Sequence, residues 1–251
     1  MGDDLNKETD KKPVALVTGA TRGIGLAVTR RLLERGCLVV GCYAGNHTAA
    51  ENARHELGLL AGDFITVHAD ISGDAGIETV AEVIDRHGRL DYLISNVGIT
   101  DKTPFGAVTR EKWNKVLDTN LTAPFFLVQR LARYLRDDEG RIILIGAVMG
   151  IRPHPMSFSY GASKAGLHFL GQSLVKVMSP RGITVNVIAP GFIETDMQID
   201  KAQEHRRRVE NKISLRRFGS PDEVAAAVAS LLDQPYITGQ VLCVDGGYDF
   251  E

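Results

Sequence analysis

Short apolar runs alternate with longer amphipathic segments along almost the whole chain, and this alternation constrains the fold most. Runs that are apolar at nearly every position suit strands buried on both faces, as in a parallel sheet. Strands that alternate with helices predict a sheet covered by helices on both faces. We therefore expect an α/β fold, a single-domain doubly wound (Rossmann) parallel seven-stranded sheet with helices on both faces. The predicted strands are Val14–Thr18, Leu38–Tyr43, Phe64–His68, Tyr92–Ser95, Arg141–Ile145, Thr184–Ile188 and Val241–Val244.

The segments between these runs have the spacing of amphipathic helices. Gly36 stands where the first helix should end, and Ser220 and Pro221 should cap and begin the last one. Pro124 lies inside the longest helical segment and should kink or divide it. The predicted helices are Ile24–Arg35, Thr48–Leu57, Ile77–His87, Thr109–Leu135, Ser157–Met178 and Asp222–Leu232.

The two ends of this pattern set the expected domain limits. Residues 1–12 are polar and charged, and we expect a disordered lead-in there. Residues 13–251 should form one dinucleotide-binding and catalytic domain, in which residues 194–213 are polar, Arg-rich and partly helical.

Composition excludes several classes of function. The chain has 251 residues and a net charge of −2, so it lacks the basic footprint of a nucleic-acid-binding protein. Its three cysteines have neither metal-ligand nor redox spacing, so we expect no metal. The first residues lack the apolar core of a signal peptide, and no apolar run is long enough to span a membrane. We expect a cytoplasmic protein.

The first predicted strand leads directly into TGATRGIG at residues 18–25, which opens a helix. In this context glycines form a phosphate-binding turn. Gly19 can make the sharp turn, Gly23 lets the backbone approach a pyrophosphate, and Gly25 allows the helix to pack closely. The helix N-terminus then offers unpaired N–H groups to the phosphates.

Four motifs in this order resemble those of the short-chain dehydrogenase/reductase family. They are TGxxxGxG, SNVG at 95–98, YGASK at 160–164 and PGFIET at 190–195. The chain is most similar to the bacterial 3-oxoacyl-[acyl-carrier-protein] reductase branch, through residues 181–197 and 237–247. The resemblance implies the following cofactor-binding residues: Gly19, Thr21, Arg22, Gly23, Ile24, Gly25, Asp70, Ile71, Asn96, Gly98, Tyr160, Lys164, Pro190, Gly191, Ile193 and Thr195.

The end of the second predicted strand indicates NADP(H) as the cofactor. An acidic residue there would bind the ribose 2′-hydroxyl of NAD and repel a 2′-phosphate. Residues 39–46 contain no Asp or Glu, and the first carboxylate is that of Glu51. Arg22, inside the glycine turn, can pair with a phosphate.

A tyrosine and a lysine form the expected catalytic pair. Lys164 follows Tyr160 by four residues, so both lie on one helix face, and the ammonium can favour the phenolate. The resemblance implies that the lysine also reaches the nicotinamide ribose, and that Asn120 holds a water in a proton relay. A cap or a helix bend is the alternative role for Asn120.

Ala147 departs from the family pattern. The family has a serine at this position, thirteen residues before the tyrosine, and its hydroxyl steadies the substrate oxygen. Loss of one such donor typically lowers the rate about 10²–10³-fold. Ser157 and Ser159 align beside the helix start and do not replace it directly. Ala147 is therefore an engineered knockout, a natural variant in which Tyr160 suffices, or the mark of a pseudoenzyme that binds NADP without turnover.

The resemblance implies a substrate and partners. The expected reaction is NADPH-dependent reduction of a 3-oxoacyl thioester, bound to carrier protein or CoA, in fatty-acid or polyketide-like synthesis. Reduction of another ketone or secondary-alcohol oxidation is the alternative. Arg181 matches a residue that docks acyl carrier protein, whereas the second docking position falls on Asp138, in an acidic run that should repel an acidic carrier. Arg206, Arg207 and Arg208 either compensate or form a solvated helix face.

We also expect a homotetramer. The helices that would form its interface are apolar over more than one face, which is typical of buried helices. The residues concerned are Phe125, Phe126, Val128, Leu131 and Tyr134 in one helix and Leu167, Phe169, Leu170 and Leu174 in the other. The segment 151–158, with Pro153, His154, Pro155 and Met156, should line the substrate mouth.

Overall fold

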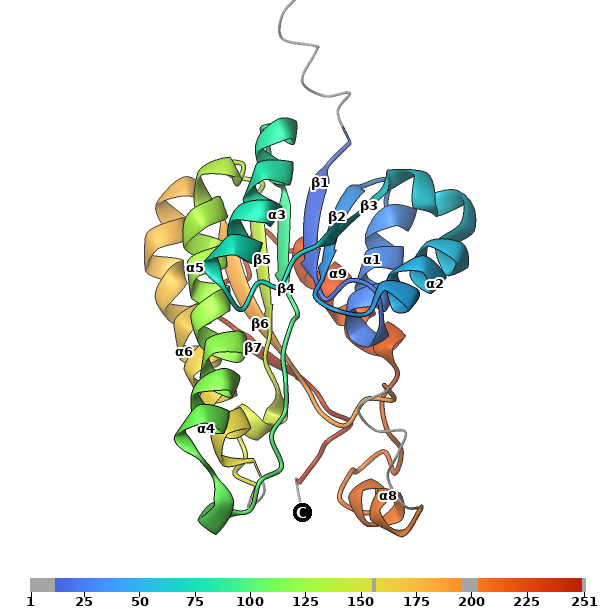
Figure 1. The fold of residues 1–251 in the computed structure, drawn as a ribbon, viewed down its shortest axis with the longest axis vertical. Coiled ribbons are helices and arrows are strands. Elements are labelled where there is room, and N and C mark those ends of the chain that lie inside the picture. The colour runs from blue at the N-terminus through green and yellow to red at the C-terminus, as the bar shows by residue number, and fades with distance from the viewer. Residues whose placement is uncertain (1–11, 155–156, 196–202, 250–251) are drawn as a thin grey trace, which may run out of the picture.

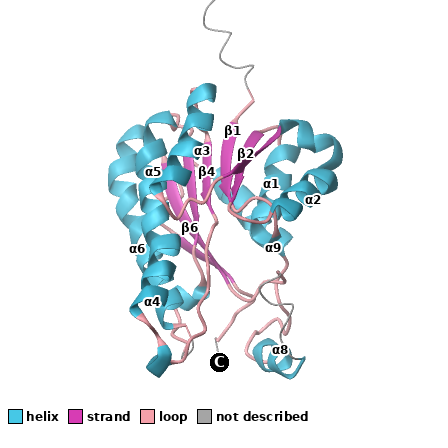
Figure 2. Ribbon diagram, in the orientation of Figure 1, coloured by secondary structure: helices cyan, strands magenta, loops and turns pink. Residues whose placement is uncertain are grey.

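The computed structural model describes residues 12–154, 157–195 and 203–249. Seven parallel strands form one sheet in the order β3-β2-β1-β4-β5-β6-β7 (Figures 1 and 2). The order reverses between β1 and β4, which makes this the place where ligands bind in open α/β sheets, at the carboxyl ends of the strands. The predicted fold class is confirmed. The predicted lead-in at 1–12 lies almost entirely outside the described residues.

The strands form where the chain is continuously apolar. Every residue of β1, β5 and β6 is buried, because helices cover both faces of the sheet. Six strands have the predicted bounds, and β6 runs two residues beyond the predicted end, since Pro190 still pairs in register with Val244. The bounds are β1 Val14–Thr18, β2 Leu38–Tyr43, β3 Phe64–His68, β4 Tyr92–Ser95, β5 Arg141–Ile145, β6 Thr184–Pro190 and β7 Val241–Val244.

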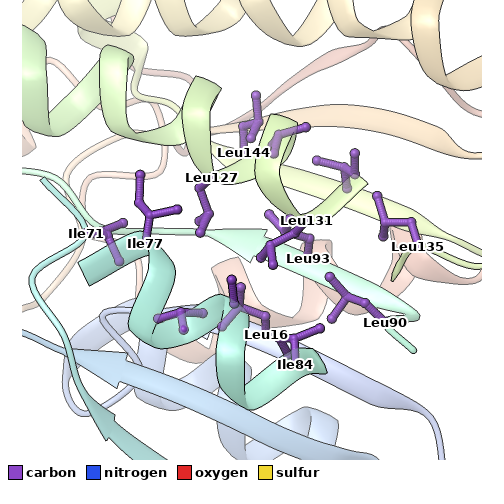
Figure 3. Close-up of a cluster of buried hydrophobic side chains, with 14 of the residues drawn as sticks. Leu16, Ile71, Ile77, Ile84, Leu90, Leu93, Leu127, Leu131, Leu135 and Leu144 are labelled. Atoms are coloured by element: carbon purple, nitrogen blue, oxygen red, sulfur yellow. The ribbon is translucent and has the colours of Figure 1, made fainter. Parts of the chain in front are cut away.

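All the described α-helices except α8 form two layers, one on each face of the sheet. Helices α3, α4, α5 and α6 cover one face, and α1, α2 and α9 cover the other (Figures 1 and 2). Leucine and isoleucine side chains of α3, α5 and the central strands meet in the core of the first layer, as Figure 3 shows. The bounds are α1 Gly23–Glu34, α2 His47–Leu57, α3 Asp74–His87, α4 Arg110–Leu117, α5 Ala123–Leu131, α6 Phe158–Met178, α8 Gln203–Glu210 and α9 Pro221–Leu232.

The predicted helix Thr109–Leu135 is interrupted before its proline. One π-helical turn, Asp118–Thr122, separates α4 from α5, and the Ala123 amide donates to the Asp118 carbonyl across it. Pro124 then occupies the first turn of α5, where its missing N–H costs least. The chain is therefore divided as expected, but at the turn that precedes Pro124.

Other helix ends follow their capping residues. Asn46 caps α2 through the Ala49 amide, so the helix begins one residue earlier than predicted. Helix α3 begins three residues before the predicted Ile77, at Asp74, a residue type that favours the first turn. Ser220 and Glu223 form a capping box at α9, as Ser220 and Pro221 predicted. No helix in the described part of the chain is long and apolar enough to cross a membrane.

Candidate active site

The glycine turn between β1 and α1 has the geometry of a phosphate cradle. Gly19 and Gly23 have φ values of +65° and +53°, which only glycine adopts readily. The amides of Gly19 and Ala20 donate to the Cys42 carbonyl at 2.9 and 3.2 Å, so the turn is tied to the end of β2. A Cβ atom on Gly25 would overlap the Gly19 carbonyl oxygen, which explains the third glycine.

The N-terminus of α1 suits an anionic ligand. Arg22 at the N-cap makes no side-chain cap, and the first turn contains no acidic residue. The first N–H groups of a helix have no partner within it, and the helix dipole favours negative charge at this end. The cradle therefore fits the pyrophosphate of a dinucleotide.

Asn96 holds the cradle against β4. Its side-chain amide donates to the carbonyls of Thr18 and Gly19 at 2.9 and 3.3 Å. The Thr18 hydroxyl in turn accepts from the amides of Asn96 and Val97, at 2.8 and 3.0 Å. Asn96, one of the predicted cofactor-binding residues, thus fixes the shape of the turn.

The other predicted cofactor residues gather at the same edge of the sheet. Thr195 lies over the cradle, since a Cβ on Gly23 would come 3.2 Å from its methyl group. Asp70 is exposed and accepts from the Ser72 amide at 3.0 Å, so it stands at the strand end as a solvated carboxylate. Thr21, Ile71 and Ile193 are buried, whereas Ile24, Gly98 and Gly191 are partly buried and Pro190 ends β6.

Tyr160 and Lys164 lie in the first two turns of α6. Lys164 is buried, and its ammonium donates to the Ile145 carbonyl at the end of β5, at 2.8 Å. The same nitrogen lies 5.8 Å from the centre of the Tyr160 ring. A Cβ on Gly98, three residues beyond the end of β4, would lie 3.2 Å from it, so this position is tightly packed against the lysine.

Burial shifts both predicted catalytic groups toward their neutral forms. It raises the pKa of Tyr160 to about 12 and lowers the pKa of Lys164 to about 8. We expected the ammonium to lower the tyrosine pKa, but at this distance the burial of the phenol is the stronger effect. The Tyr160 hydroxyl therefore keeps its proton at neutral pH and can donate it.

The side-chain amide and carbonyl groups of Asn120 all take part in structural hydrogen bonds. Its side chain is buried in the π-helical turn, accepts from the Ile99 amide at 2.8 Å, and donates to the Ile99 carbonyl at 2.9 Å. It also donates to the Ser163 hydroxyl at 3.0 Å, which joins the turn to α6 beside Lys164. Pro124, four residues on, has no N–H to give to the Asn120 carbonyl. The helix-bend role is thus visible, and the relay role stays a prediction.

Ala147 brings no hydroxyl to this site. It is buried and extended, and its amide donates to His168 Nε2 at 3.3 Å. Ser159 is buried and its hydroxyl donates to Asp101 at 3.4 Å, so it does not stand in for a serine at position 147.

His168 was missed by the sequence interpretation. Its ring fills the space that Gly146 and Gly150 leave, since a Cβ on either would overlap it. Burial and the nearby Lys164 lower its pKa to about 4, so the ring is neutral and accepts the Ala147 amide. Its place one helical turn after Lys164 was the available signal.

The predicted substrate mouth and its surroundings are apolar where they are described. Phe105, after β4, and Phe158, at the start of α6, lie with ring centres 5.3 Å apart, and both are exposed. Ile151 adds a third exposed apolar side chain. Pro155 and Met156 of the predicted mouth lie outside the described residues. Across residues 12–154, 157–195 and 203–249, no group of His, Cys, Asp or Glu is placed to hold a metal ion.

Comparison with known proteins identifies the family. A family model described as "Enoyl-(Acyl carrier protein) reductase" matches residues 19–249. A short-chain dehydrogenase/reductase from Serratia marcescens superposes with a TM-score of 0.89 and 31% identity, over 94% of this chain and 98% of that one. The chain belongs to the short-chain dehydrogenase/reductase family.

Several members of the short-chain dehydrogenase/reductase family resemble the chain along nearly its full length. The 3-oxoacyl-[acyl-carrier-protein] reductase of Synechocystis is 38% identical over 239 residues, 93% of this chain and 96% of that protein. The reductase of the same name from Escherichia coli is 38% identical over 238 residues, with the same coverage. The Pseudomonas aeruginosa RhlG/NADP complex matches with a TM-score of 0.88 and 34% identity, covering 95% and 96%.

Arg181 of this short-chain dehydrogenase/reductase lies far from Tyr160 within one subunit. Helix α6 has 21 residues and is therefore about 30 Å long, with Tyr160 near its start and Arg181 just beyond its end. The Arg181 guanidinium donates to Asp137 at 2.7 Å and to the Ala132 carbonyl at 2.6 Å. The Asp138 amide donates to the Arg181 carbonyl at 2.8 Å, so the two predicted docking positions adjoin.

Two of the three arginines of α8 are paired with carboxylates. Arg206 pairs with Glu194 and Glu210, and Arg208 pairs with Glu204. These pairs match the solvated helix face, one of the two alternatives for this segment.

Proposed function

We propose that the protein reduces a 3-oxoacyl thioester to the 3-hydroxyacyl thioester with NADPH, in fatty-acid or polyketide-like synthesis. The observation that carries the proposal is the pair of Tyr160 and Lys164 at the carboxyl edge of the sheet, beside the phosphate cradle. Full-length similarity to 3-oxoacyl-[acyl-carrier-protein] reductases supports this substrate class. The exposed apolar side chains of Phe105, Phe158 and Ile151 suit an acyl chain at the mouth.

NADP(H) is the proposed cofactor. The cradle fits a pyrophosphate, and no carboxylate lies between Leu38 and Asn46 to repel a 2′-phosphate. Two similar structures carry this cofactor in their names: the RhlG/NADP complex, and a metagenomic blue fluorescent protein with NADPH (TM-score 0.87, 33% identity, 94% and 97% coverage). When bound, a reduced nicotinamide dinucleotide supplies the hydride.

The side chains of the chain supply the proton and fix the geometry. Tyr160 keeps its proton at neutral pH, because burial raises its pKa, and donates it to the substrate oxygen as negative charge develops there. The Lys164 ammonium stabilises the tyrosinate left behind. Asn120 holds the Ile99 backbone and the Ser163 hydroxyl, and so keeps the loop after β4 in place beside Tyr160.

Ala147 limits the proposed reaction, because no hydroxyl donates to the substrate oxygen from that position. We expect Ala147→Ser to raise NADPH oxidation with acetoacetyl-CoA by about 10²–10³-fold. The matched control is Tyr160→Phe in the Ala147→Ser background, which should remove the gain because the proton donor is lost.

The outcomes of this assay separate the candidate functions. Equal, substantial rates in both forms would mean that the natural site works without the hydroxyl. If NADPH binds but neither form reduces a ketone, the reductase hypothesis is excluded and a pseudoenzyme is favoured. Ala147 is the only observation that supports a pseudoenzyme. Activity on decalone but not on acetoacetyl-CoA would favour a reductase of another ketone.

We also propose a cytoplasmic homotetramer that contacts acyl carrier protein through Arg181. The names of the relatives support a carrier-bound substrate. Because Arg181 lies at the far end of α6, a carrier protein bound there would deliver its acyl group to the site of a neighbouring subunit.

A further inference from the structure

Three aromatic rings meet where β2 and β3 end. The rings of His47 and His68 have centres 4.6 Å apart, and the Tyr43 ring lies 5.5 Å from the first and 5.4 Å from the second. Both histidines are exposed and Tyr43 is partly exposed. Such spacings are those of interacting aromatic pairs, so the cluster is a formed surface feature without a place in the mechanism above.

The cluster borders the phosphate cradle. Tyr43 pairs in register with His68 across the two strands. The residue before it, Cys42, accepts the amides of Gly19 and Ala20 from the cradle. In a dinucleotide-binding fold, the end of the second strand is where the ribose 2′ position is recognised. The rings therefore stand where a carboxylate would select NAD.

Hydrogen bonds orient the two imidazoles. A carbonyl can only accept, so His68 Nε2 donates to the Ala44 carbonyl, at 2.6 Å, and holds the loop after β2. The Tyr43 hydroxyl lies 3.2 Å from His47 Nδ1. With the hydroxyl as the donor, the proton of His47 sits on Nε2, which leaves one N–H for a ligand.

The charges around the cluster are mixed. Glu51 follows His47 by one helical turn, and Arg54 of the same helix donates to the Thr66 hydroxyl of β3 at 3.5 Å. Asp70, just beyond β3, accepts a hydrogen bond from the amide of Ser72, two residues later in the same turn. Arg22 lies in the cradle itself.

We propose that His47 is a specificity-determining residue that donates a hydrogen bond to the 2′-phosphate of NADPH. His68 is its positioning residue: it packs against the His47 ring and fixes the Ala44 backbone. The inference rests on the proposed cofactor and goes beyond it by naming the side chains that distinguish NADPH from NADH.

Binding measurements test this without turnover. Dissociation constants for NADPH and NADH are measured from the fluorescence of the bound reduced nicotinamide, in the wild type, His47→Ala and His68→Ala. The control is His55→Ala, an exposed histidine of the same helix outside the cluster. Adenosine 2′,5′-bisphosphate and adenosine 5′-monophosphate, used as competitors, probe the 2′-phosphate alone. Circular dichroism checks that each variant folds.

We expect His47→Ala to raise the dissociation constants of NADPH and of the bisphosphate by about ten-fold or more. This is the effect of losing one hydrogen bond to a charged group. The dissociation constants of NADH and of the monophosphate should change by less than about two-fold, since these ligands lack the 2′-phosphate. His68→Ala should lower the NADPH/NADH preference by a smaller factor, and His55→Ala should leave it unchanged.

Three results would overturn the inference. A wild-type preference for NADPH that survives in His47→Ala would refute it while leaving the proposed function intact. Equal losses for NADPH and NADH would mean that the rings bind adenine instead. A wild type that does not prefer NADPH would refute both this inference and the proposed cofactor.

Discussion

The shared environment of Tyr160 and Lys164 suits the two different tasks proposed for them. Burial disfavours the charged form of each, so the pKa of the phenol rises to about 12 while that of the ammonium falls to about 8. Near pH 7 the tyrosine is protonated and the lysine is still mostly charged. The site is therefore set for proton donation, and the first group to change its charge in alkaline solution is the lysine.

This order predicts the alkaline limb of the pH profile. Lys164 is charged below its pKa of about 8 and loses its proton above it, so kcat/KM for ketone reduction should fall as pH rises through about 8. Steady-state rates between pH 6 and pH 10 would measure it. An arginine introduced by Lys164→Arg stays charged over this range. The decrease of kcat/KM with pH should therefore be smaller in this variant, even if its rate is lower. A wild-type profile that stays level to pH 10 would contradict the assignment.

Helix α9 illustrates how a single element is fixed by its first turn. Ser220 accepts the Glu223 amide at 3.2 Å, and Glu223 accepts the Ser220 amide at 2.8 Å. Arg217 and these hydrogen bonds lower the pKa of Glu223 to about 2, so the carboxylate remains charged over the working range. The helix packs on α1 and on the core of the second layer.

Removal of this cap should destabilise the whole fold. We expect Ser220→Ala to lower the free energy of unfolding by about 1 kcal/mol, because the Glu223 amide loses its acceptor. Urea denaturation followed by circular dichroism would measure it. Ser230→Ala, an exposed substitution later in α9, is the matched control and should not destabilise. Equal effects of the two substitutions would show that the cap contributes nothing.

Sequence patterns predicted the strands and helices better than the turns and contacts that connect them. Six of the seven strands have the predicted bounds, because a doubly covered parallel strand is apolar at nearly every position. The π-helical turn was not predicted, since it depends on where Asn120 meets Ile99 and Ser163 rather than on local propensity. Contacts of this kind join residues far apart in sequence, as does the His168 contact with Ala147. The ring cluster at β2 and β3 likewise appears only when two strands pair.

At the scale of the whole molecule, the apolar helices divide into core and surface. Leu131, Leu167 and Leu174 are buried in the core of the first layer. Three other apolar residues are exposed instead: Phe126 by 44%, Phe169 by 71% and Val177 by 66% of their surface. Apolar side chains of this size, exposed on helices of one layer, are typical of a surface that another subunit covers.

Assembly can therefore be tested at this surface. Phe169→Glu should convert the proposed tetramer into smaller species, because a carboxylate cannot be buried there without a partner. Light scattering after size exclusion would give the mass of each form. Leu59→Glu places the same charge at an exposed leucine after α2, on the opposite face, and should leave the mass unchanged. A Phe169→Glu protein that stays tetrameric would place the interface elsewhere.

The last strand of the sheet suggests a second consequence of the proposed assembly. Within the described part of the chain, strand β7 pairs with β6 alone, and Leu242 within it is 42% exposed. A bare strand edge with apolar side chains is a template on which other chains can pair and precipitate. A neighbouring copy that covers this edge would keep the protein in solution, so variants that dissociate should also become prone to aggregate. The contact that assembles the subunits would then also be the one that keeps this protein from aggregating.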